Sequence, residues 1–312
     1  MLETTNRGGT DRLAALCRMV QATGYRFITP TPATHARVNA RPGNTRARDL
    51  QGVLGWSRPF DVSAVPANLL AAMHEGNVVV PAEQGWRSLV RASSLNGMLF
   101  LHSAYPTTAD DSVFFGPDTY RFAQAIEPVL ARPVLRAVDI GCGAGPGAVL
   151  IARAHPEAEV FGVDINEAAL RLTRANADAA GVAVNAVRSD LMTEVPGQFD
   201  LIVANPPYMV DPSARAYRHG GGVLGAGLSL KILDAAIERL APGGTLLLYT
   251  GAAIVDGRDP LRDAASARLA GSSLEWCYRE VDPDVFGEEL EAGAYAEADR
   301  IAAVTLTVTR LG

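Results

Sequence analysis

The sequence predicts an α/β protein: a Rossmann-like, doubly wound, mostly parallel seven-stranded sheet with a terminal antiparallel hairpin, preceded by a small α+β N-terminal domain. Two observations support this. From about Tyr120 onward, short apolar runs alternate with helical patterns, which is typical of parallel strands joined by helices. Before residue 105 this alternation is missing, and the Asn96-Gly97 pair between two apolar runs predicts a hairpin instead.

Residues 1–105 are expected to form the accessory α+β domain, which would recognise substrate or act as a lid. Residues 1–9 show no periodic pattern and are expected to be disordered. Apolar residues recur at helical spacing over 11–22, and Gly24 closes that predicted helix. A loop is predicted over 28–46, and short helices are predicted over 49–54 and 66–75.

Residues 106–312 are expected to form the catalytic domain. The predicted parallel strands cover 134–140, 158–164, 182–188, 200–204 and 245–250, and the clearest helical patterns cover 166–180 and 228–240. The last two apolar runs, 272–281 and 300–310, have no full helix between them. They therefore predict the antiparallel hairpin at the end of the sheet.

The composition favours a globular protein of a reducing compartment. Of 312 residues 48% are hydrophobic, and the three cysteines are far apart, which argues against a disulfide framework. No Cys/His cluster suggests a metal site, and no apolar run approaches membrane-spanning length. A cytoplasmic protein without a membrane partner or a bound metal is expected, and the sequence leaves the oligomeric state open.

The formal net charge of −6 conceals an asymmetry. Residues 1–60 contain nine arginines and three acidic residues, whereas the remainder contains 19 basic and 31 acidic residues. Arginine binds phosphate bidentately and stacks on bases. The N-terminal arginines, such as Arg37, Arg41, Arg46 and Arg48, could therefore dock ribosomal RNA or a ribonucleoprotein. Alternatively, they could pair with the acidic stretch near Glu288–Glu291 of the same chain.

A glycine-rich turn, "VDIGCGAGPG", follows the first predicted strand and opens a helix. Asp139 ends that strand, and Gly141, Gly143 and Gly145 permit a tight turn with a close approach to a ligand. The run from Gly143 also satisfies the GxGxxA form of the dinucleotide fingerprint. A turn of this kind can, however, merely connect a strand to a helix.

Two further carboxylates end the second and third predicted strands. Asp164 can accept both hydroxyls of a ribose, or it can cap the next helix, a role that Asn166 could take instead. Asp190 is placed to accept a hydrogen bond from an adenine amine, or it is a turn aspartate. Ile165 and Leu191, which follow these carboxylates, are expected to contact the same ligand. To this point a nicotinamide dehydrogenase remains as open as a methyltransferase.

The stretch "ANPPYMV" ends the fourth predicted strand. Two successive prolines stop a strand and hold Asn205 to Tyr208 rigidly at the sheet edge where ligands bind in open α/β folds. As a whole, the array of Asp139, the glycines, Asp164, Asp190 and NPPY resembles the class I S-adenosylmethionine (SAM)-dependent methyltransferases over about residues 110–310. Within them it resembles the amino-methyltransferases: the HemK/PrmC-like and RsmC-like enzymes and the DNA adenine methyltransferases.

This resemblance implies SAM as cofactor and a planar amide or exocyclic amine nitrogen as methyl acceptor. It also implies that Phe115 and Thr119, which precede the glycine turn, hold the methionine end of the cofactor. Such a nitrogen is a poor nucleophile because its lone pair is delocalised. Acceptors at its N–H bonds, the Asn205 amide oxygen and the Pro206 carbonyl, would favour localisation of the lone pair. Tyr208 could stack on the planar group.

The acceptor itself is less determined. After NPPY, a glycine-containing stretch with Arg215, Arg218 and His219 predicts a mobile loop, where HemK-like proteins often carry an acidic one. Nine acids between Glu275 and Asp299 predict a solvated loop between the last two strands. A protein glutamine or a ribosomal RNA base is the expected acceptor. A small metabolite, with the N-terminal domain as lid, and a non-catalytic SAM-binding scaffold are the alternatives, while NPPY disfavours a dehydrogenase.

Overall fold

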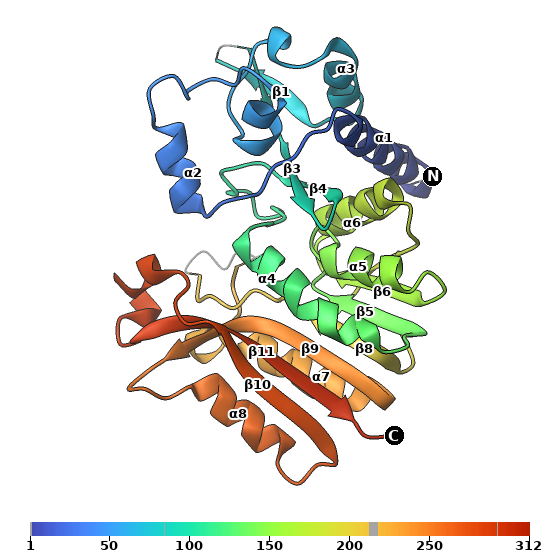
Figure 1. Ribbon diagram of the computed structural model, residues 1–312, viewed down its shortest axis with the longest axis vertical. Coiled ribbons are helices and arrows are strands. Elements are labelled where there is room, and N and C mark those ends of the chain that lie inside the picture. The colour runs from blue at the N-terminus through green and yellow to red at the C-terminus, as the bar shows by residue number, and fades with distance from the viewer. Residues whose placement is uncertain (1, 84, 212–217, 292) are drawn as a thin grey trace.

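The computed structural model describes every residue except 1, 84, 212–217 and 292. A seven-stranded sheet in the order β10-β11-β9-β8-β5-β6-β7 forms its centre (Figure 1). Its strands, in chain order, are Arg136–Ile140 (β5), Glu159–Asp164 (β6), Asn185–Arg188 (β7), Phe199–Ala204 (β8), Leu240–Ile254 (β9), Leu274–Asp282 (β10) and Arg300–Arg310 (β11). The strands from β7 to β9 are parallel, and β11 pairs antiparallel with both β9 and β10. The predicted fold class is confirmed.

The chain order of the strands reverses beside β5. The chain runs outward from β5 through β6 to β7 and then returns to place β8 on the other side of β5. At such a reversal the connections leave in opposite directions and open a crevice at the carboxyl ends of the strands. The Asp139 end of β5 and the Ala204 end of β8 lie in register at this crevice.

Helices cover both faces of this sheet. They are Pro117–Ile126 (α4), Pro146–Ala154 (α5), Glu167–Ala180 (α6), Gly227–Arg239 (α7) and Pro260–Leu269 (α8). Helices α7 and α8 pack against β9 on one face, while α5 and α6 lie on the other (Figure 1). The prediction did not include α8, although Asp259 caps it by accepting from the Arg262 N–H and Pro260 occupies its first turn.

The N-terminal region is α+β, as predicted. Its elements are Leu2–Ala22 (α1), Pro32–Asn39 (α2), Ala67–Glu75 (α3), Val79–Ala82 (β1), Gly85–Ser88 (β2), Val90–Leu95 (β3) and Met98–Ser103 (β4), with a π-helical turn at Gln51–Gly55. Strands β3 and β4 form the predicted hairpin around Asn96 and Gly97. Short 3-10 turns at Val62–Ala64, Glu127–Ala131, Val223–Gly225, Gly287–Glu291 and Gly293–Tyr295 complete the chain.

Two predictions for this region are wrong. Helix α1 begins at Leu2, so residues 2–9 are helical rather than disordered, since adding a turn to an existing helix avoids the cost of nucleation. The segment 28–46 is not a continuous loop, because it contains α2. The Thr31 side chain caps α2 by accepting from the Thr34 N–H, and Pro32 supplies a helical φ at the first position.

The N-terminal region is packed directly on the sheet domain. Helix α1 contacts α6 (Figure 1). One continuous core contains buried residues of both regions. The buried Asn176 side chain on α6 accepts from the Leu101 N–H (2.8 Å) and donates to the carbonyls of Leu101 (2.9 Å) and Ala144 (2.8 Å). One amide thereby joins β4 to the glycine turn. The division of the chain into domains at residue 105 stays a prediction.

Among the described residues, no helix combines the length and the apolar character that crossing a membrane would require. The same residues contain no group of three His, Cys, Asp or Glu side chains arranged to hold a metal ion.

The Asn176→Ala variant should be markedly less stable. It leaves both polar groups of Leu101 and the Ala144 carbonyl without their partner, and an unpaired buried polar group costs about 1–3 kcal/mol. We expect the free energy of unfolding, measured by urea denaturation, to fall by at least about 2 kcal/mol. The control is Asn185→Ala, an exposed position on β7, which should change it by no more than about 0.5 kcal/mol. An unchanged urea midpoint for Asn176→Ala would contradict the structural role given to this amide.

Candidate functional site

A cavity of about 420 Å³ lies in the crevice at the carboxyl ends of the parallel strands. This volume is in the range of small-molecule binding sites, which is about 300–1,000 Å³. Most of the residues predicted from the sequence line it: Thr119, Asp139, Gly141, Gly143, Asp164, Ile165, Asn166, Asp190, Leu191, Asn205, Pro206 and Tyr208. Residues from the N-terminal side of the molecule, including Pro32, Tyr105 and Thr108, form another part of its wall.

The Asp164 carboxylate is bound to the glycine turn rather than capping α6. Its Oδ2 accepts from the Gly143 N–H (3.0 Å), and its Oδ1 accepts from the Asn166 N–H (2.9 Å). The Asn166 side chain caps α6 by accepting from the Ala168 N–H (2.9 Å). The sequence alternative in which Asn166 is the cap therefore describes the structure. Burial raises the pKa of Asp164, while the backbone N–H donors oppose that shift.

Asp139 lies beneath the glycine turn. It is almost fully buried, and its Oδ2 accepts from the Ala148 N–H at the start of α5 (2.9 Å). Burial raises its pKa from 3.8 to about 7; the N–H of Ala148 opposes the shift, and the charge of Asp164 adds to it. Gly143 has a φ of 56°, so the turn above Asp139 uses a conformation that favours glycine.

An apolar part of the wall surrounds the third carboxylate. Ile165 is a large hydrophobic residue, yet 55% of it is exposed, and it faces the cavity together with Leu191. Asp190, which lines the same cavity, is exposed. An exposed aliphatic surface beside a free carboxylate suits a flat apolar ring that carries a hydrogen-bond donor.

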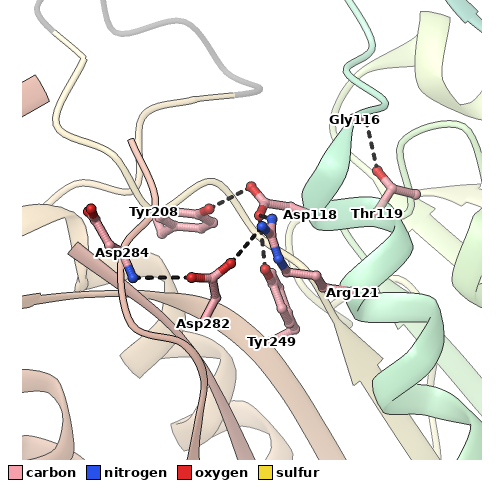
Figure 2. A network of polar contacts seen from close by, with 8 residues as sticks. All are labelled: Gly116, Asp118, Thr119, Arg121, Tyr208, Tyr249, Asp282 and Asp284. Atoms are coloured by element: carbon pink, nitrogen blue, oxygen red, sulfur yellow. Dashed lines mark hydrogen bonds and ion pairs between the residues drawn. The ribbon is translucent and has the colours of Figure 1, made fainter. Parts of the chain in front are cut away.

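Two predicted cofactor residues do not line this cavity. Phe115 is buried, and its ring stacks on His102 (centroids 5.0 Å apart), so its neighbour Phe114 lines the cavity instead. Gly145 is a packing position: a Cβ there would lie 2.9 Å from Thr173. Thr119 does line the cavity, where its hydroxyl accepts from the Gly116 N–H (3.2 Å) and closes the first turn of α4 (Figure 2).

The NPPY residues follow β8 directly and line the cavity. The Asn205 side chain is half-buried there and has no hydrogen-bond partner among the described residues. Pro206 is buried, and the Tyr208 ring is packed so closely on β9 that a Cβ at Gly251 would lie 2.2 Å from it. The asparagine is thus available to a ligand, whereas the tyrosine is largely enclosed by protein.

Asp118, on the first turn of α4, holds Tyr208 in place (Figure 2). The Tyr208 hydroxyl donates to Asp118 Oδ2 (2.6 Å), and the Tyr249 hydroxyl on β9 donates to Oδ1 (2.9 Å). Arg121 also donates to Oδ1 (3.2 Å) and reaches Asp282 at the end of β10 (2.7 Å). Burial, and then the charge of Asp118, raise the pKa of Tyr208, so its hydroxyl remains a donor. The sequence did not place Asp118 at the site, because its partners Tyr208 and Tyr249 are distant from it along the chain.

The acidic stretch after β10 is not simply a solvated loop. Phe286 from this stretch lines the cavity and contacts the Tyr208 ring edge-on (centroids 5.9 Å apart). Tyr295 is buried, and its hydroxyl accepts from the Val210 N–H (2.9 Å). The stretch covers the NPPY segment because its apolar members, which the charge pattern obscured, pack inward. Its acids Asp282 and Glu289 are paired with arginines.

The glycine-containing segment after NPPY packs on it. Gly220 donates to the Met209 carbonyl (2.8 Å), and a Cβ at Gly225 would lie 2.0 Å from the Tyr208 carbonyl oxygen. The close approach explains the glycines in the described part of the segment, while the predicted mobility of the loop stays a prediction. Arg218 lines the cavity and pairs with Glu289, while His219 accepts from the Asp211 N–H. Arg215 lies outside the described residues.

The residues that line the cavity fit S-adenosylmethionine. A carboxylate held at the glycine turn suits ribose hydroxyls, and the exposed Ile165 and half-buried Leu191, on the same wall as Asp190, suit adenine and its amine. The buried Asp139 and the first turn of α4 border the remaining volume. NPPY is part of the same wall, so an acceptor group at Asn205 would share the cavity with this cofactor.

Comparisons with known proteins agree with this geometry. Residues 123–254 match the family described as "Methyltransferase small domain". The release factor glutamine methyltransferase of Bordetella pertussis is 32% identical over 237 residues, covering 68% of this chain and 84% of that protein. That of Deinococcus radiodurans is 35% identical over 167 residues, which cover 49% of this chain but only 55% of that protein. This chain therefore spans about half the length of the Deinococcus relative.

Among solved structures, this chain is similar to the 16S rRNA N2 G1207 methyltransferase RsmC of T. thermophilus, in complex with AdoMet and guanosine. The structural alignment covers 84% of this chain and 68% of RsmC. The sequence identity is 18% and the TM-score is 0.46.

The raised pKa of Asp139 predicts a specific pH dependence of stability. The folded chain holds this proton up to about pH 7, whereas the unfolded chain releases it near pH 3.8, so stability from this group falls as pH rises between the two values. Within this interval, the free energy of unfolding falls by about 1.4 kcal/mol for each pH unit. Asp139→Asn, which mimics the neutral acid, should remove this slope.

Urea denaturation of both proteins at several values from pH 4.5 to 7.5 checks this. The stability of the original chain relative to Asp139→Asn should decline from pH 4.5 to about pH 7 and level off above it. A difference that stays constant with pH would mean that Asp139 is ionised in the folded protein.

Proposed function

We propose, on the premise that this chain belongs to the family of the release factor glutamine methyltransferases, that it transfers a methyl group from S-adenosylmethionine to a planar nitrogen, the side-chain amide of a protein glutamine. The observation that carries the proposal is the Asn205 side chain, which lines the cavity directly after β8 and has no hydrogen-bond partner among the described residues. The cavity wall around it suits the cofactor. The named relatives support glutamine as the acceptor.

The cofactor would be held by groups already fixed in place. Asp164 would accept the ribose hydroxyls, Asp190 would accept from the adenine amine, and Ile165 and Leu191 would enclose the ring. The glycine turn and Thr119 would border the methionine end. When bound, the cofactor supplies an electrophilic methyl group whose bond to sulfur breaks as the acceptor nitrogen's lone pair forms the new bond to carbon.

Asn205 and Pro206 would prepare the acceptor nitrogen. An amide nitrogen becomes more positive and tetrahedral as its lone pair localises. The Asn205 amide oxygen and the Pro206 carbonyl, both acceptors, would stabilise its N–H bonds most in that state. No strong base is required beforehand, because the extra proton can pass to water after transfer. Two prolines fix the direction of the carbonyl.

Tyr208 would form the rigid wall against which the planar amide lies, and Asp118 would be its positioning residue. The 2.6 Å bond from the Tyr208 hydroxyl to Asp118 fixes the ring relative to α4, and the Gly251 backbone limits it from below. A loss of about 1 Å in alignment can cost on the order of 10²-fold in rate. We therefore propose that Asp118 affects the rate of methyl transfer by fixing the position of Tyr208.

Residues 1–105 are proposed to bind the macromolecular acceptor. Their Pro32 and Tyr105 form part of the cavity wall, and Arg37, Arg41 and Arg48 are exposed. Arg46 pairs with Asp61, and Glu289 of the acidic stretch pairs with Arg218, which argues against internal pairing of the N-terminal arginines with that stretch. The free thiols of Cys17, Cys142 and Cys277 support action in the cytoplasm.

Asn205→Ala tests the proposed reaction. The variant should bind the cofactor with unchanged affinity, because Asn205 would act on the acceptor. It should slow methyl transfer on the order of 10²-fold or more, the effect of removing an acceptor or donor that acts in the transition state. Single-turnover transfer of labelled methyl to a bacterial peptide-chain release factor, with mass spectrometry of the modified peptide, provides the rate and the site. Transfer at the original rate would reduce NPPY to a turn.

Asp118→Asn tests the positioning role. Losing the charged acceptor should loosen Tyr208, and we expect kcat to fall on the order of 10-fold, equivalent to about 1.4 kcal/mol, while cofactor affinity is unchanged. Tyr208→Phe should have a similar effect, and the two changes together should not be additive. Tyr249→Phe, which removes a different bond to the same carboxylate, is the matched control and should retain kcat. Additive effects would argue against action through Tyr208.

A further inference from the structure

We propose that a second, smaller cavity binds a compact carboxylate through Arg91 and His35. The cavity measures about 20 Å³ and lies between the segment that leads into α2, the β3–β4 hairpin and the segment before α4. Its volume exceeds the ~10–15 Å³ that one water needs and limits a ligand to a small group. Nothing in the methyl-transfer site described above uses these two side chains.

Arg91 is a buried cation without a charged partner. Only 5% of it is exposed, and its one hydrogen bond to a described residue runs from Nε to the Gly55 carbonyl (2.9 Å). Nη2 is buried and has no partner among the described residues, and no carboxylate there forms an ion pair with it. Burial lowers its pKa to about 10, so the side chain keeps its charge at neutral pH. A buried charge is strongly destabilising unless something compensates it.

His35 is the second unpartnered group on the same cavity. Only 1% of it is exposed, its ring lies 4.1 Å from that of Tyr105, and its Nε2 is buried without a partner among the described residues. Burial, reinforced by the charge of Arg91, lowers its pKa to about 4, so the imidazole is neutral. Nε2 donates in the tautomer in which Nδ1 accepts from the Asn39 amide (3.4 Å).

The other polar side chains around this cavity are satisfied. His102 shares a hydrogen bond with Ser93, which in turn pairs with Thr29, and the Tyr25 hydroxyl donates to the Ala92 carbonyl. Across the described residues, His35 Nε2 and Arg91 Nη2 are the buried side-chain nitrogens or oxygens without a partner, and both residues line this one cavity. The buried charge of Arg91 favours an anion in this cavity, and His35 Nε2 can donate to that anion when Nδ1 is the acceptor.

A carboxylate meets these requirements. It is small, negatively charged and accepts only, and it offers two oxygens to two donors. Pro32, Thr107 and Phe114 form walls of both this cavity and the large one, so the two sites are adjacent. The carboxylate could therefore belong to a free acid or to a molecule that occupies the large cavity.

Thermal unfolding of the full chain in sodium formate tests the site. Ionic strength is held constant with a sulfonate too large for the cavity. The unfolding temperature of the original chain should rise saturably with formate. Arg91→Met should raise the half-saturating concentration at least tenfold, and so should His35→Phe, which keeps the ring and removes Nε2. Arg37→Met, an exposed arginine on the same helix as His35, should leave it unchanged.

The absence of a saturable shift in the original chain would overturn the proposal. A formate-dependent shift in His35→Phe equal to that of the original chain would also overturn it. This variant retains the charge of Arg91 and provides the test if Arg91→Met does not fold. A second titration, of S-adenosylhomocysteine with and without saturating formate, shows whether the carboxylate belongs to a free acid or to the ligand of the large cavity. Weaker binding in formate assigns the site to a carboxylate of the ligand in the large cavity, and unchanged binding assigns it to a free acid. If S-adenosylhomocysteine does not bind at all, the proposed function fails while the formate result stands.

Discussion

The buried carboxylate of Asp118 accepts hydrogen bonds from Tyr208, Tyr249 and its helical neighbour Arg121, and so it joins α4 to the segment after β8 and to β9, which are distant in sequence. It lies on the first turn of α4, where a negative charge is favourable. With both tyrosines protonated and Arg121 charged, all its partners are donors. The end of β8 is thereby held against the same cavity that the glycine turn borders, and the positions of the proposed cofactor residues and of NPPY become interdependent.

Close backbone packing completes this constraint. The Tyr208 ring has room only because Gly251 has no side chain. The Tyr208 carbonyl oxygen likewise has room only because Gly225 has none. The stretch after β10 then covers NPPY with Phe286, and Arg121 connects the end of β10 to Asp118. Among the NPPY residues, Asn205 lines the cavity with a side chain that has no hydrogen-bond partner among the described residues. That is the property an amide acceptor needs, because a preorganised acceptor requires little rearrangement during the reaction.

The sequence predicted the sheet and the cavity-facing carboxylates because these signals are local. An apolar run that ends in aspartate, glycine or NPPY identifies its own position at a strand end. It could not predict that Asp118 contacts Tyr208, since 90 residues separate them. Whether Phe114 or Phe115 faces the cavity depends on a one-residue choice of direction in an irregular segment. The inward packing of Phe286 and Tyr295 was hidden by surrounding acids, and the isolation of Arg91 depends on burial, which charge counting does not reveal.

A crystal structure of the chain with S-adenosylhomocysteine would test most directly whether NPPY and the cofactor residues form one active site. We expect the adenine between Ile165 and Leu191, the ribose hydroxyls on Asp164, and the sulfur facing the Asn205 side chain, with the Tyr208–Asp118 bond retained. Binding outside this cavity, or a sulfur directed away from Asn205 while the adenine occupies the predicted place, would contradict it.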